Sequence, residues 1–120
     1  MEVQEARQTE PTEEMIAEWK KHGIVYRVSI MGINFYYRNI TRAEFRHNLK
    51  MTSTGATMYD PSAAADATLQ GEELTVQTAL LWPKMGLDAV QASPAGMVSK
   101  LAELIMEASG FDDASIPEQL

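Results

Sequence analysis

Between residues 24 and 38 apolar and polar side chains alternate with a period of two, the pattern of half-buried β-strands. The alternation runs through IVYRVSI, stops at Met31 and Gly32, and resumes in INFYYR. A two-residue break that contains glycine predicts a hairpin turn with Gly32 in the left-handed conformation. An isolated hairpin is marginally stable in water, so we expect one of its faces to pack on helices or on another strand.

A helix is predicted before the hairpin, in EEMIAEWKKHG. Thr12 precedes it as an N-cap, and two glutamates occupy its first turn, where negative charge is favoured. Its apolar side chains, Trp19 among them, lie on one face. This helix therefore has a short apolar stripe with which to contact something else.

A second helix is predicted directly after the hairpin. Thr41 and Glu44 have the spacing of a capping box, in which a hydroxyl and a carboxylate each accept from the other residue's backbone N–H. We expect the helix to run over residues 42–51, with Phe45 and Leu49 facing inward.

The final helix carries the clearest apolar face. Ser93 is its expected N-cap, Pro94 suits its first position, and Gly110 ends it, with Phe111 folding back on the last turn. The apolar face includes Met97, Leu101 and Leu104.

The remaining segments complete a prediction of one domain. Residues 52–71 are small and polar and read as a loose loop, and residues 71–83 as a helix. We expect a small α+β domain over residues 11–112, a β-hairpin packed against three to four helices. An acidic, flexible arm is expected at residues 1–10 and an acidic tail at residues 113–120.

The charge is unevenly placed along the chain. The net charge is −7, but residues 20–50 hold seven Lys or Arg against one acid, while residues 51–120 hold two Lys against ten acids. Arg42, Arg46 and Lys50 are four residues apart and form a basic ridge on the second predicted helix. This polarity indicates an asymmetric partner or association between copies of the chain.

The sequence offers little catalytic chemistry. There is no cysteine, and neither His22 nor His47 has a second ligand at metal-binding spacing. Adjacent carboxylates on a helix do not face each other and make poor acid–base pairs. We therefore expect no catalytic, cofactor-binding or metal-binding residues and no enzyme activity. No apolar run approaches the ~20 residues that span a bilayer, so we expect no membrane partner.

Two kinds of partner remain. Tyr36 and Tyr37 beside several arginines would suit a single-stranded nucleic acid, but the acidic pI of about 4.7 argues against it. Protein binding fits better, because the eight methionines can form adaptable apolar surfaces or fill a small core. The residues predicted to contact a partner are Arg38, Arg42 and Arg46 through polar groups, and Trp19, Met97, Leu101 and Leu104 through apolar ones.

These features together resemble small tailed-bacteriophage proteins of the tail-assembly chaperone and baseplate-hub assembly type. The shared pattern is a helix with a tryptophan, a hairpin, a corner of the form R-x-x-[ST]-R-x-E-[FY], an apolar-proline segment and a final helix closing on Ser-Gly-Phe. It covers residues 14–50 and 78–112, about two-thirds of the chain. The corner residues are Arg38, Thr41, Arg42, Glu44 and Phe45.

The resemblance implies a non-catalytic assembly factor made in the cytoplasm of an infected bacterium. Its partner would be a phage tail structural protein or further copies of itself, as a homo-oligomer. Two alternatives stay open. One is a permanent small subunit of the tail or baseplate in the virion, and the other is a single-stranded nucleic-acid-binding protein.

Overall fold

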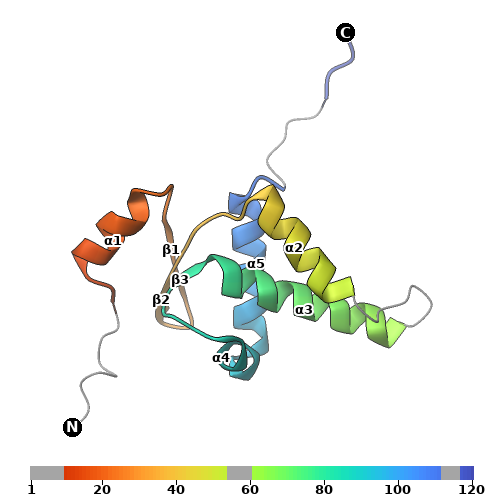
Figure 1. The fold of residues 1–120 in the computed structure, drawn as a ribbon, viewed down its shortest axis with the longest axis horizontal. Coiled ribbons are helices and arrows are strands. Elements are labelled where there is room, and N and C mark those ends of the chain that lie inside the picture. Colours follow the sequence, from red (N-terminus) through yellow and green to blue (C-terminus); the bar gives the residue numbers. More distant parts are fainter. Residues whose placement is uncertain (1–9, 54–60, 112–116) are drawn as a thin grey trace.

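The computed structural model describes residues 10–53, 61–111 and 117–120. Within these ranges the chain forms five helices and three strands, which confirms the predicted α+β class (Figure 1). In chain order the elements are α1 (Glu13–Lys20), β1 (Tyr26–Ile30), β2 (Ile33–Tyr37), α2 (Arg42–Ser53), α3 (Pro61–Ala79), β3 (Leu80–Trp82), α4 (Leu87–Ala92) and α5 (Ala95–Ala108).

The hairpin forms where the alternation predicts it. β1 and β2 pair antiparallel with Ile30 opposite Ile33, which leaves only Met31 and Gly32 in the turn. Both turn residues have positive φ, 55° at Met31 and 78° at Gly32, as a type I′ turn requires. Gly32 adopts this conformation readily, whereas the methionine side chain makes it costly at position 31.

The sheet lies between two helical layers (Figure 1). Its order is β1-β2-β3, and all neighbours are antiparallel. One face presents Phe35 and Tyr37 to the core, and α3 and α5 lie on that side. The other face carries Tyr36, against which Trp19 of α1 packs. The largest fully buried side chains are Phe35, Val76, Val90, Leu101 and Ile105.

The segment expected to be a loose loop is partly helical. α2 continues to Ser53 and α3 begins at Pro61, so the prediction is wrong for residues 52–53 and 61–71, while residues 54–60 lie outside the described residues. The alanines of AAADA favour a helix, and α3 then packs against both α2 and α5. The predicted helix over residues 71–83 ends early, because the chain turns extended and β3 pairs with β2.

The inward face of α2 also differs from the prediction. Phe45 is half-buried as expected, but Leu49 is exposed, and Asn48 and Thr52 are buried instead. Asn48 donates a hydrogen bond to the Thr78 hydroxyl of α3 at 3.3 Å, so the contact between these helices is partly polar. Apolar spacing alone therefore predicted the position of Phe45 correctly and that of Leu49 wrongly.

The prediction for α5 fails at its N-terminal end and holds at its C-terminal end. Pro94 occupies the N-cap position without a side-chain hydrogen bond, while the Ser93 hydroxyl donates to the Ala89 carbonyl of α4, so the predicted cap is wrong. The C-terminal end is as predicted. Gly110 has a φ of 93°, and the Phe111 N–H donates to the Met106 carbonyl, which is a Schellman motif.

The two expected terminal segments are only partly described. Residues 1–9 and 112–116 lie outside the described residues. Glu10 is described and is hydrogen-bonded to the sheet, so the prediction of a flexible arm is wrong for this residue. Residues 117–120 are exposed and have no regular secondary structure.

Leu101→Ala should lower the free energy of unfolding by about 3 kcal/mol, because truncating a buried leucine leaves a cavity. Leu49→Ala is the matched control, since it removes the same atoms from a side chain 51% exposed instead of 1% exposed. We expect the control to cost less than about 0.5 kcal/mol. Urea denaturation followed by circular dichroism measures both, and equal losses would contradict the core assignment of Leu101.

Met31→Asn should raise the free energy of unfolding by about 0.5–1 kcal/mol, because asparagine tolerates the left-handed conformation better than methionine. Ile33→Asn is the control, since Ile33 lies in an extended strand where asparagine gains nothing. Thermal unfolding of the three proteins checks the expectation. A less stable Met31→Asn protein would show that the methionine side chain stabilises the monomer.

Candidate functional site

The segment that joins β2 to α2, residues 38–45, is called the corner below. Its helix begins with the capping box that the sequence predicts. The Glu44 N–H donates to the Thr41 hydroxyl at 3.2 Å, and the Thr41 N–H donates to Glu44 Oε1 at 2.9 Å. Two N–H groups that a helix start leaves unpaired are thereby satisfied, and the direction of α2 is fixed.

Arg38 holds the corner against the rest of the domain. Its guanidinium binds both oxygens of Glu44, Nη1 to Oε1 at 3.0 Å and Nη2 to Oε2 at 2.9 Å. The same group donates to the carbonyls of Asn39 at 2.9 Å and of Thr78 in α3 at 3.0 Å. Arg38 was predicted to contact a partner, but the structure commits its donors to holding the corner.

These contacts shift the acidity of Glu44. Its pKa falls from 4.5 to about 2, chiefly because Arg38 hydrogen-bonds to the ionised form. Partial burial opposes the shift, and the Thr41 backbone N–H adds to it. The carboxylate therefore stays ionised well into the acid range.

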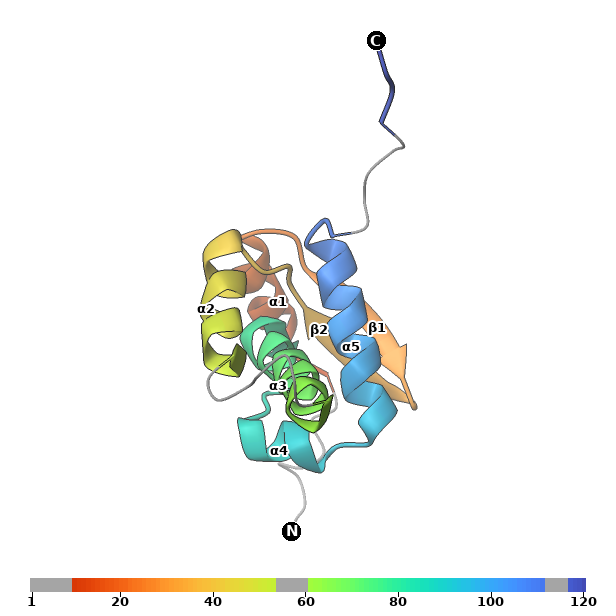
Figure 2. The same ribbon diagram turned by 90° about the vertical axis from the view of Figure 1, so that its right-hand side faces the viewer.

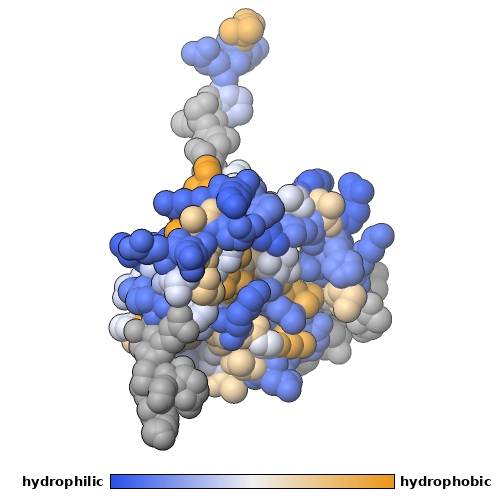
Figure 3. All heavy atoms as spheres, turned by 60° about the vertical axis from the view of Figure 1, so that its left-hand side comes forward, coloured by the Kyte–Doolittle hydropathy of each residue, from blue (hydrophilic) through white to orange (hydrophobic). Residues whose placement is uncertain are grey.

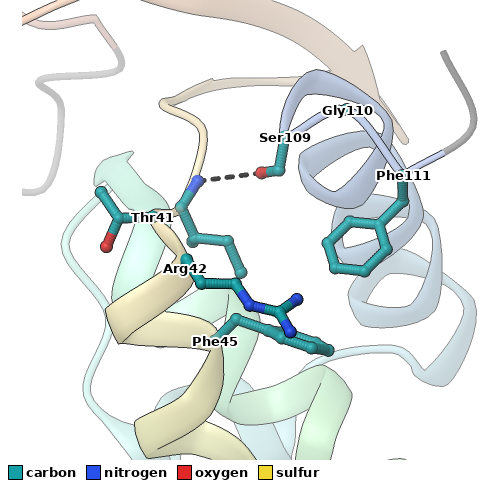
Figure 4. Close-up of a pocket in the computed structure, with 7 residues that line it drawn as sticks. Thr41, Arg42, Phe45, Ser109, Gly110 and Phe111 are labelled. Carbon is teal, nitrogen blue, oxygen red and sulfur yellow. Dashed lines mark hydrogen bonds between the residues drawn. The ribbon is translucent and has the colours of Figure 1, made fainter. Parts of the chain in front are cut away.

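An open hollow of about 250 Å³, called the corner hollow below, lies between the start of α2 and the end of α5 (Figure 4). The Ile40 N–H donates to the Ser109 hydroxyl at 2.9 Å and ties its two sides together. Ser109 in turn donates to the Ile105 carbonyl at 2.7 Å. The residues lining it are Ile40, Thr41, Arg42, Phe45, Ser109, Gly110 and Phe111.

Two aromatic rings and one cation give the corner hollow its chemistry. The rings of Phe45 and Phe111 are 4.9 Å apart at 60°, and Phe111 remains 47% exposed. Figure 4 shows the Arg42 side chain extending toward these rings. No carboxylate of the described residues pairs with Arg42. The hollow can thus receive an apolar group that has a negative charge beside it.

The basic ridge predicted on α2 is exposed. Arg42, Arg46 and Lys50 all lie at the surface, one helical turn apart. Across residues 10–53, 61–111 and 117–120, Arg46 has no acidic partner either. Arg42 and Arg46 therefore keep the role of candidate polar contacts, and Arg42 adjoins the corner hollow.

A second hollow of about 290 Å³ lies between α1 and the corner. Trp19 lines it and also packs on Tyr36, with ring centroids 6.0 Å apart. Arg38 and Thr41 line its opposite side, so Thr41 borders both hollows. Figure 3 shows the side of the molecule that carries α1 as mostly hydrophilic, with small apolar areas between polar side chains. Trp19 stays a candidate apolar contact.

α1 is fastened to the sheet through Glu10, three residues before the helix begins. The Glu10 carboxylate accepts hydrogen bonds from the Asn34 amide and the Tyr36 hydroxyl, both at 2.6 Å. The bond from Tyr36, and then that from Asn34, lowers the pKa of Glu10. No residue of α1 itself is buried, so these bonds and the Trp19–Tyr36 contact hold the helix in place.

Three other predicted contacts belong to the interior. Met97 and Leu101 are buried, and Leu104 is half-buried against the same core. For Met97 and Leu101 burial contradicts the predicted partner contact, because this face of α5 packs on the sheet and α3. For Leu104 the partner contact stays a prediction. Sequence reasoning missed Phe111 as a site residue, although the glycine before it had predicted that the chain folds back.

The structure also bears on the other chemistries considered. Tyr36 and Tyr37 are buried, so their faces are not open for stacking with bases. In the described part of the chain no group of three or more His, Cys, Asp or Glu residues could hold a metal ion. None of the helices described is both long enough and apolar enough to cross a membrane.

Glu44→Gln should flatten the acid limb of the stability curve. Since folding lowers the pKa of Glu44, the unfolded chain binds a proton first, and the stability that Glu44 contributes above pH 4.5 is lost as the pH falls toward 2. Glu44→Gln should be less stable than the unsubstituted protein at pH 7. Between pH 4.5 and 2 its free energy of unfolding should fall by a smaller amount. Urea denaturation across this range measures it.

The control for this series is Glu103→Gln. Glu103 pairs with Lys100 at 3.4 Å on an exposed surface, where ion pairs contribute little. It should keep the pH dependence of the unsubstituted protein. If Glu44→Gln and Glu103→Gln gave the same curve, the Arg38–Glu44 pair would not be the source of the acid sensitivity.

No protein family, characterised protein or solved structure matches the chain. The corner, its two hollows and the exposed arginines of α2 are therefore the features that bear on function.

Proposed function

We propose that this chain is a non-catalytic assembly factor that binds a structural protein of a phage tail or baseplate at the corner hollow. The observation that carries the proposal is the partly exposed Phe45–Phe111 pair beside Arg42, whose charge no described carboxylate neutralises. Aromatic residues, phenylalanine among them, and arginine are enriched in protein interfaces relative to the rest of the surface.

The rigidity of the site supports a binding role. Arg38 and the capping box fix the start of α2, and the bond from Ile40 to Ser109 fixes it against α5. Groups that are ordered before binding lose little conformational entropy when a partner arrives. The expected ligand is a segment that places a large apolar side chain between the rings and a carboxylate beside Arg42 or Arg46.

The phage-tail role is supported by where the resembling motif lies. Arg38 and Glu44 of the R-x-x-[ST]-R-x-E-[FY] corner fix its geometry. Thr41, Arg42 and Phe45 of the same motif line the corner hollow. The corner motif, one of the five features that carry the resemblance, thus supplies residues of the candidate site, and the cellular setting would be the cytoplasm of an infected bacterium.

Photo-crosslinking tests the partner. Benzoylphenylalanine in place of Phe111 keeps an aromatic group at the hollow, and we expect it to crosslink a tail or baseplate protein in infected cells. The same probe at Leu69, an exposed position on α3, is the control. Crosslinking at Leu69 but not at position 111, or to nucleic acid, would contradict the proposal. A chain retained in purified particles would instead be a permanent subunit.

Affinity for the partner so identified gives the quantitative test. Arg42→Glu and Phe111→Ser should each weaken binding at least tenfold, about 1.4 kcal/mol, without changing the melting temperature by more than a few degrees. Lys84→Glu is the matched charge reversal, on an exposed lysine outside both hollows. An equal loss with Lys84→Glu would mean that net charge, and not the corner hollow, governs binding.

A further inference from the structure

The outer edge of β1 is open. In the described residues β1 has a single neighbour, β2, and Figure 2 shows it at the margin of the molecule with no described element beyond it. In a hairpin with a two-residue turn the closing pair exchanges backbone hydrogen bonds, as does every second pair after it. The pairs that bond within the hairpin therefore involve Tyr26, Val28 and Ile30, and the backbone N–H and C=O of Arg27 and Ser29 face outward.

Apolar side chains flank this open edge at both ends. Ile24, just before β1, is 68% exposed, and Met31 and Ile33, at the turn, are 69% and 44% exposed. Met31 also holds a φ of 55°, a left-handed backbone conformation that is costly for a residue with a side chain. A costly backbone conformation that displays an apolar side chain to solvent points to a contact made by that side chain.

We propose that two copies of this chain pair antiparallel through their β1 edges, about a two-fold axis at Val28. In this register Arg27 of each copy lies opposite Ser29 of the other. The outward backbone groups of Arg27 and Ser29 then bond in both directions, and the two three-stranded sheets become one sheet of six strands.

Charge and turn geometry favour this register over the two adjacent registers, which are centred on Arg27 and on Ser29. A pairing centred on Arg27 would place two arginines opposite each other, which is unfavourable. A pairing centred on Ser29 would require Met31, which lies in the turn, to continue the strand. The register centred on Val28 avoids both problems, since the residue facing each arginine is an uncharged serine.

The same register also brings an acid toward each arginine. Asn34 pairs with Ser29 within the hairpin and holds the Glu10 carboxylate at 2.6 Å. Asn34 of the second copy would thus lie two strands from Arg27, about 10 Å at the usual strand spacing. Arg27 already interacts with Tyr36 and with Glu10 of its own copy. In the pair the Glu10 carboxylate of the second copy would lie on its other side, so each arginine gains a second acidic neighbour and the two edges are complementary in charge.

The exposed apolar groups meet in this arrangement as well. Because the strands run antiparallel, Ile24 of one copy falls beside the turn of the other, where Met31 and Ile33 are exposed. The two-fold axis repeats the contact at the other end, as an isologous interface does. Backbone bonds, charge and apolar surface therefore all fit the same partner, a second copy of this chain.

Sedimentation equilibrium over a wide concentration range tests the pairing. The mass should rise from 13.3 kDa toward twice that value. Ser29→Lys should weaken the dimer about three- to tenfold, because it sets two like-charge pairs opposite each other, while Ser29→Glu should strengthen it by a similar factor. Ser29 is exposed, so neither substitution disturbs the core, and circular dichroism checks the folding of both.

Disulfide crosslinking tests the register by an independent readout, since the chain has no cysteine of its own. Residues at position 28 of the two copies would be about 4.5 Å apart between Cα atoms, within disulfide range. Val28→Cys should therefore crosslink on mild oxidation. Ser29→Cys is the control, because its two copies are offset along the strands and lie beyond the roughly 7 Å limit.

Several results would overturn the pairing. A monomer at every concentration would exclude it, and so would a dimer indifferent to the charge at position 29. An oligomer that dissociates in high salt would show that the basic and acidic parts of the chain associate instead. Equal crosslinking of Val28→Cys and Ser29→Cys would exclude the register. Phe111→Ser should leave the dimer intact, so this result is separate from the fate of the proposed function.

Discussion

The bidentate pair between Arg38 and Glu44 is the interaction on which the arrangement of this domain depends. Arg38 follows the last residue of β2, Glu44 lies in the first turn of α2, and the same guanidinium reaches the Thr78 carbonyl near the end of α3. The Arg38 N–H also donates to the Ala79 carbonyl, where α3 gives way to β3. One residue thus positions the sheet, α2 and α3 relative to each other. Since the pair is about one-third exposed, its main contribution is directional.

Local signals in the sequence predicted the parts of the fold that local chemistry decides. The turn at Met31 and Gly32, the capping box of Thr41 and Glu44, and the end of α5 at Gly110 all appear where expected. Each depends on a few neighbouring residues whose backbone requirements are strict. Apolar periodicity also predicted the two strands of the hairpin, because alternate residues of each strand pack on the core.

The sequence does not show which neighbouring element a segment will pair with or pack against when several would suit it. LLW continues the apolar run of α3, but it becomes β3 because the edge of β2 is available to pair with it. Met97 and Leu101 have the same spacing in a core as in a binding surface, and only the position of the sheet distinguishes the two. The corner hollow escaped prediction as well, since nothing local shows that Phe111 meets Phe45.

The bond from Ile40 to Ser109 joins residues 69 positions apart in the chain. During synthesis the hairpin and the start of α2 emerge well before the end of α5 exists. The side of the corner hollow formed by residues 40–45 is therefore made before the side formed by residues 109–111. The hollow is complete only once α5 has docked on the core. A chain interrupted before α5 could fold its hairpin yet present only half of the hollow, so the ability to bind there reports that folding of the domain is finished.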